Sequence, residues 1–150
     1  MRDFKKSIPF RAMADTYYVW VGGSCDYAHE ERAGSGAYII EKENKRIDDY
    51  IISEFHTTEF RMLLKVMLHA MTQIPTGAKI CFLSNVAYLQ NFDKQPDATM
   101  ANSDLIEQCI VAKANHAECF VKIIPYHKYP TLPETHEMAH RAMKDLRNNQ

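Results

Sequence analysis

The sequence lacks a long hydrophobic run, an excess of charge of either sign and any closely spaced cysteine pair. No apolar stretch approaches the ~20 residues that cross a bilayer, which argues against a transmembrane helix and against membrane association. The 18 Lys and Arg residues nearly balance the 19 Asp and Glu residues, so the net charge of the chain does not indicate tight nucleic-acid binding. Residues 1–15 contain basic side chains without the apolar core of a secretory signal.

The remaining composition is that of an ordinary globular domain. Apolar residues make up 46% of the 150-residue chain, which is long enough for one domain with a real core. We therefore expect an N-terminal arm over 1–15 and a single domain over 16–150. Four cysteines are spread along the chain without a Cys-x-x-Cys pair: Cys25, Cys81, Cys109 and Cys119. Isolated cysteines of this kind are typical of reduced thiols, so we expect a cytoplasmic protein.

Hydrophobic periodicity and turn residues predict three hairpinned strands followed by two strands that are linked by helices. Strands are expected over 16–21, 37–45, 46–55, 79–83 and 119–126. Helices are expected over 57–73, 85–92 and 103–116, and from Pro133 onward, with Thr57 or Thr58 capping the first of them. Gly22–Cys25 is expected to break the first strand and 26–36 to form a polar loop. The order β-β-β-α-β-α-α-β-α argues for an α/β fold with helices packed on a mixed sheet.

Five short segments carry a resemblance to a known family. In chain order they are VWVGGSC, HTTEFRMLLKV, ICFLSNVAYL, IIPYHKYP and THEMAHRAM. Together they resemble the first strand, first helix, fourth strand, fifth strand with its loop, and last helix of the ribonuclease H family. The resemblance covers Tyr17–Asn148. It implies a ribonuclease H-like fold, in which a five-stranded mixed sheet of order 3-2-1-4-5 is flanked by helices.

The activity of that family rests on four carboxylates that hold two divalent ions about 4 Å apart. Carried over position by position, these carboxylates fall on four other residues: Gly22, Leu63, Asn85 and His136. None of the four is a carboxylate, and Mg²⁺ prefers charged oxygen ligands. The resemblance therefore implies a pseudoenzyme without a Mg²⁺ or Mn²⁺ site. The loop histidine of the family corresponds to His127, which alone cannot support metal-dependent hydrolysis.

A divergent nuclease that uses displaced carboxylates is one alternative. Asp26 follows the first predicted strand. Glu59 precedes Leu63 by one helical turn, and Glu137 adjoins His136. Each of these acids needs a rearranged backbone to reach a metal site, so our interpretation is that they are solvated side chains.

A second alternative is a zinc-dependent hydrolase, because residues 136–140 read His-Glu-Met-Ala-His. On a helix, His136 and His140 share a face and can bind Zn²⁺, with Glu137 as general base. Only ten residues follow His140, which leaves little room for a downstream third ligand. We therefore interpret the pair as two surface imidazoles without a metal.

The sequence thus favours a catalytically inactive ribonuclease H-like domain that acts as a binding or assembly module. Glu59 lies where members of the family use small polar residues to touch a nucleic-acid backbone, and its carboxylate would repel phosphate. Together with the net charge of -1, this favours a protein partner or self-association over binding of an RNA–DNA hybrid.

Overall fold

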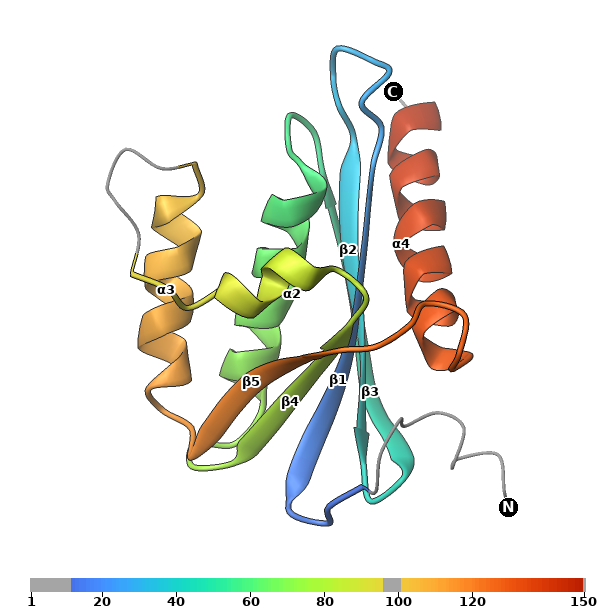
Figure 1. Cartoon of the computed structure of the whole chain (residues 1–150). Coiled ribbons are helices and arrows are strands. Elements are labelled where there is room, and N and C mark those ends of the chain that lie inside the picture. Colours follow the sequence, from blue (N-terminus) through green and yellow to red (C-terminus); the bar gives the residue numbers. More distant parts are fainter. Residues whose placement is uncertain (1–11, 96–100, 150) are drawn as a thin grey trace.

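Five strands form one sheet with helices on both faces, as the computed structural model shows for residues 12–95 and 101–149 (Figure 1). The strands are β1 Thr16–Cys25, β2 Gly34–Lys42, β3 Lys45–Glu54, β4 Lys79–Ser84 and β5 Glu118–Ile123. The helices are α2 Glu59–Gln73, the short 3₁₀ helix η1 Ala87–Asn91, α3 Ser103–Lys113 and α4 Thr131–Asn148. None of the helices in this described part of the chain is long and apolar enough to cross a membrane.

The strand order is β3-β2-β1-β4-β5, which confirms the order 3-2-1-4-5 implied by the resemblance. The strands β1, β2 and β3 pair antiparallel through short turns, whereas β4 runs parallel to both β1 and β5. Parallel neighbours need crossover connections, which α2 and α3 provide on one face of the sheet. The last helix, α4, covers the opposite face (Figure 1).

Alternating side chains of β1 build two separate cores. Val19 and Val21 point to the face covered by α2 and α3, where they join the larger hydrophobic cluster. Tyr18 and Trp20 point to the other face and pack in a smaller cluster with Leu132 of α4. This period of two is the signature of a strand buried on both faces. The central strand β1 therefore packs against helices on both faces of the sheet.

Several predicted boundaries were wrong. The segment Gly22–Cys25 does not break the first strand, because its residues pair with 34–37 of β2; the polar loop is therefore shorter than predicted. The strand β5 ends at Ile123, ahead of the proline at 125, and α4 begins at Thr131 instead of Pro133. The predicted arm over 1–15 lies largely outside the described residues.

The start of α2 is set by a side-chain cap. Of the two predicted candidates, Thr58 is the N-cap, and its Oγ1 accepts a hydrogen bond of 3.1 Å from the backbone N–H of Arg61. This bond satisfies one of the free N–H groups of the first helical turn. It fixes the point at which Glu59 and Leu63 project from the helix.

Candidate functional site

The four positions assigned to lost carboxylates lie on β1, α2, α4 and the turn after β4. Gly22 sits directly beneath α4: a Cβ atom at this position would lie 2.8 Å from the backbone N and 3.0 Å from the Cα of His136. Contacts this short to backbone atoms require one of the two elements to shift. The close packing of α4 on β1 therefore depends on glycine at position 22.

The neighbouring glycine faces α2 instead. A Cβ atom on Gly23 would lie 3.0 Å from Cγ of Glu59 and 3.1 Å from Cγ of Leu63. Leu63 is fully buried and belongs to the larger hydrophobic cluster. An aliphatic side chain and the methylene part of Glu59 thus fill the space between α2 and the end of β1.

His136 and Asn85 are joined to each other. The Nε2 of His136 donates to Oδ1 of Asn85 over 3.2 Å. Burial lowers the pKa of His136 from its usual 6.5, although a hydrogen bond with the backbone of Gly23 acts in the opposite direction. Tyr126 packs edge-on against the imidazole, with ring centroids 5.0 Å apart. The pair is therefore a neutral, hydrogen-bonded bridge between the end of β4 and α4.

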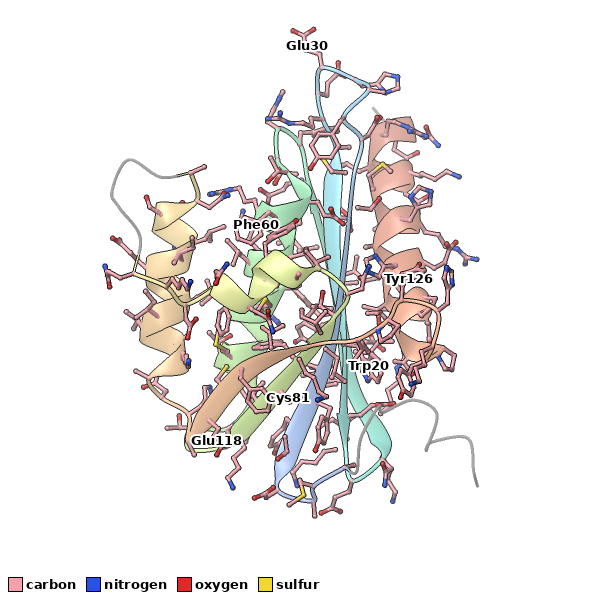
Figure 2. All side chains as sticks on the ribbon, in the orientation of Figure 1. Trp20, Glu30, Phe60, Cys81, Glu118 and Tyr126 are labelled. Atoms are coloured by element: carbon pink, nitrogen blue, oxygen red, sulfur yellow. The ribbon has the colours of Figure 1, made fainter. Side chains whose placement is uncertain are left out.

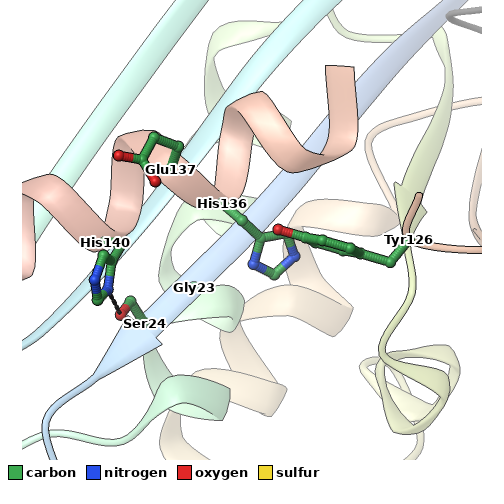
Figure 3. Close-up of a pocket in the computed structure, with 6 residues that line it drawn as sticks. All are labelled: Gly23, Ser24, Tyr126, His136, Glu137 and His140. Atoms are coloured by element: carbon green, nitrogen blue, oxygen red, sulfur yellow. Dashed lines mark hydrogen bonds between the residues drawn. The ribbon is translucent and has the colours of Figure 1, made fainter. Parts of the chain in front are cut away.

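A shallow cavity of about 310 Å³ opens beside this bridge (Figure 3). Its lining residues are Gly23, Ser24, Tyr126, His136, Glu137 and His140. The ring of His136 faces Tyr126, whereas Nδ1 of His140 lies 3.2 Å from Oγ of Ser24. The two histidines of the His-Glu-x-x-His run thus share one cavity but have different partners.

No protein-family model and no curated protein matches this sequence. Among solved structures, it is similar to the crystal structure of LC9-RNase H1, a type 1 RNase H with the type 2 active-site motif. The TM-score is 0.70 at 16% sequence identity, over 91% of this chain and 75% of that chain. The chain has a ribonuclease H-like fold. At this level of identity the similarity concerns the fold alone.

Two of the three acids considered as displaced metal ligands, Asp26 and Glu137, form ion pairs with other side chains. The carboxylate of Asp26 lies 2.6 Å from Nδ1 of His29 and 3.3 Å from Nη1 of Arg147. Burial acts to raise the pKa of Asp26, but hydrogen bonds from these side chains and a backbone N–H outweigh it and lower that pKa. Glu137 is bound by Nε of Arg141 over 2.8 Å. Both acids therefore serve local structure.

The third acid, Glu59, differs from the other two. Burial raises the pKa of its half-buried carboxyl group. Within the described part of the chain, that carboxylate has no hydrogen-bond or ion-pair partner, unlike those of Asp26 and Glu137. No group of three or more His, Cys, Asp or Glu side chains among residues 12–95 and 101–149 could hold a metal ion.

His127, which the resemblance matched to the loop histidine of the family, is exposed next to Tyr126 of the cavity. Its ring packs edge-on against Tyr126 with centroids 4.7 Å apart, and Tyr126 in turn contacts His136. Nothing in the sequence pointed to Tyr126 beyond its position next to His127. Nothing pointed to Ser24 either, since it reaches the cavity only because β1 continues past the two glycines.

Proposed function

We propose that this ribonuclease H-like domain is catalytically inactive and acts as a binding or assembly module. The observation that carries the proposal is the hydrogen bond between His136 and Asn85. Hydrolysis of a phosphodiester by two metal ions needs charged oxygen ligands around both ions. The four assigned positions offer one neutral carbonyl oxygen, and that oxygen already accepts a hydrogen bond.

The residues present do not fit a pair of Mg²⁺ or Mn²⁺ ions for steric reasons as well. The backbone of α4 takes the space that a side chain at Gly22 would need. The side chain of Leu63 contains no oxygen that could bind a metal ion, and it is fully buried. Charge that could offset the dehydration of the ions is therefore lacking at the assigned positions.

A protein partner or self-association fits the charge of this site better than a nucleic acid does. Cγ of Glu59 lies 3.0 Å from the place of a Cβ atom on Gly23, and no cation pairs with this acid in the described part of the chain. Proteins that bind nucleic acids gain most of their affinity from Lys and Arg contacts to phosphates. A phosphate that approached the end of β1 would meet an unpaired carboxylate.

The proposal is tested with a fluorescently labelled RNA–DNA hybrid, followed by anisotropy and cleavage together at low salt, in Mg²⁺ and then in Mn²⁺. Duplex DNA and single strands serve as controls. We expect no cleavage, and at most weak binding that salt abolishes. Cleavage that survives Asn85→Ala and His136→Ala but is lost in Asp26→Asn or Glu59→Gln would contradict the proposal.

One observation favours a divergent nuclease as the second candidate. Glu59 lies against Gly23 and its carboxylate has no partner among residues 12–95 and 101–149, so it could reach a metal without first leaving one, unlike Asp26 and Glu137. A nuclease of this kind would be stabilised by Mg²⁺ or Mn²⁺ and would lose that effect in Glu59→Gln. A zinc hydrolase would instead retain about one zinc per chain through purification and lose it in His140→Ala.

A further inference from the structure

Three aromatic side chains lie near Glu59 at the start of α2. The hydroxyl of Tyr27 accepts a hydrogen bond of 3.0 Å from the backbone N–H of Glu59. Phe60, labelled in Figure 2 between α2 and η1, packs edge-on against Tyr88 with ring centroids 4.8 Å apart. Tyr27 is 62% exposed and Tyr88 46% exposed, so both rings are open to solvent. We call these four residues the aromatic surface.

No cation among residues 12–95 and 101–149 forms a hydrogen bond or ion pair with the carboxylate of Glu59. Other acids beside α2 are paired: Glu54 binds Lys65 at 2.7 Å and Asp104 binds Arg61 at 2.9 Å. Burial raises the pKa of Glu59 without an opposing contribution. Half-buried carboxylates are normally paired, because desolvation without a partner is unfavourable.

Tyr88 lies within electrostatic reach of Glu59. Burial raises the pKa of its phenol, and the negative charge of Glu59 raises it further. Burial and, to a smaller extent, the charge of Glu59 also raise the pKa of Tyr27, so both phenols lie close enough to Glu59 to interact with it electrostatically. A cation placed among them would be attracted by the carboxylate and by the electron-rich ring faces at the same time.

We infer that the aromatic surface binds a single Lys or Arg side chain presented by a protein partner. The inference rests on the proposed function, since it names the partner chemistry of a binding module. Exposed aromatic rings can also stack on nucleic-acid bases, but here they lie near a carboxylate that repels phosphate. Aromatic and Arg side chains that meet in a partly desolvated pocket are typical of the energetic centre of a protein interface.

The probe is the peptide Ac-Gly-Gly-Arg-Gly-Gly-NH2, titrated into the isotopically labelled full chain and followed by NMR of the aromatic rings. The matched neutral probe carries citrulline in place of arginine. The variants are Glu59→Gln, which removes the charge at the centre, and Glu118→Gln, which removes an exposed carboxylate on the edge strand β5. Tyr88→Leu tests the aromatic contribution.

We expect saturable shifts of the Tyr27, Phe60 and Tyr88 ring signals with the arginine peptide. The Kd should increase about tenfold, corresponding to about 1.4 kcal/mol, with citrulline or in Glu59→Gln, and should not change in Glu118→Gln. Tyr88→Leu should also weaken binding. Equal affinity for the two peptides, or shifts that do not saturate, would overturn the inference.

The failure of this inference is distinguishable from failure of the proposed function. Metal-dependent cleavage of the hybrid by the wild-type chain would refute the proposed function even if the arginine peptide bound. Absence of peptide binding together with absence of cleavage would refute only the assignment of the aromatic surface. Binding of a labelled single strand that is lost in Tyr88→Leu but unchanged in Glu59→Gln would replace the protein partner by a nucleic acid.

Discussion

Replacement of Gly22 by alanine tests the close packing of α4 on β1. The new Cβ atom would lie 2.8 Å from the backbone N of His136, and backbone atoms of a helix cannot rotate away. The neighbouring substitution, Gly23→Ala, is the matched control on the opposite face of the same strand. Its Cβ would meet side-chain carbons of Glu59 and Leu63 at 3.0 Å and 3.1 Å. Those side chains can yield by small rotations.

The two variants should differ in their free energy of unfolding, because backbone atoms must move in one and side-chain atoms in the other. Overpacking of a closely packed region costs about 1–3 kcal/mol. The helix α4 is anchored by the fully buried residues Leu132 and Ala139, so we expect Gly22→Ala to lie at the upper end, about 2–3 kcal/mol. For Gly23→Ala we expect a cost of about 1 kcal/mol or less. Alanine lowers the conformational entropy of the unfolded chain relative to glycine, which offsets part of the strain by about 0.4–1 kcal/mol.

Equilibrium unfolding in urea, followed by circular dichroism, measures both variants. With a slope of about 1–3 kcal/mol/M, the midpoint for Gly22→Ala should fall by roughly 1 M or more, and that for Gly23→Ala by much less. Equal midpoints for the two variants would show that α4 does not lie where the structure places it. The steric part of the proposal would then be lost, and an aspartate at position 22 would again be compatible with the site.

Four further predictions concern single side chains. Thr58→Ala should lower the free energy of unfolding by about 1 kcal/mol, measured in urea, because it removes the N-cap of α2. Glu59→Gln should raise the free energy of unfolding at pH 7 and leave it unchanged below pH 4, since a raised pKa means that the half-buried carboxylate destabilises the fold once it ionises. The wild-type chain should lose stability as the pH falls below 6.5, the usual pKa of histidine, because the unfolded chain binds a proton more tightly than the partly buried His136 does. This part of the pH dependence should be absent in His136→Gln. Iodoacetamide should modify Cys25 in the native protein, as mass spectrometry would show, while the other three thiols react only after unfolding, because they are buried and their pKa values are raised to about 12.

The sequence predicted the order of the elements well because their signals are local. The alternation in β1, the helical spacing before Gln73 and the cap at Thr58 all depend on near neighbours. The end of β1 was predicted wrongly because two adjacent glycines usually break a strand. Here they pair with β2, and Gly22 admits the α4 backbone.

The candidate site was only partly predictable for a related reason. The resemblance pointed to Asn85 and His136, but their mutual hydrogen bond depends on how α4 sits against the end of β4. The spacing of His136 and His140 suggested a shared ligand, whereas each ring has found a different partner. That Glu59 has no partner among the described residues could not be read from the sequence, because Lys and Arg residues are abundant along the chain.

The central claim is that the end of β1 holds no pair of divalent ions. The most direct measurement is the free energy of unfolding in EDTA and in 10 mM Mg²⁺ or Mn²⁺, at matched ionic strength. An ion that binds only the folded state, with a Kd of one tenth of the applied concentration, would raise that free energy by about 1.4 kcal/mol. We predict no change. A rise of that size that is lost in Glu59→Gln would contradict the claim and establish a metal site built from a displaced acid.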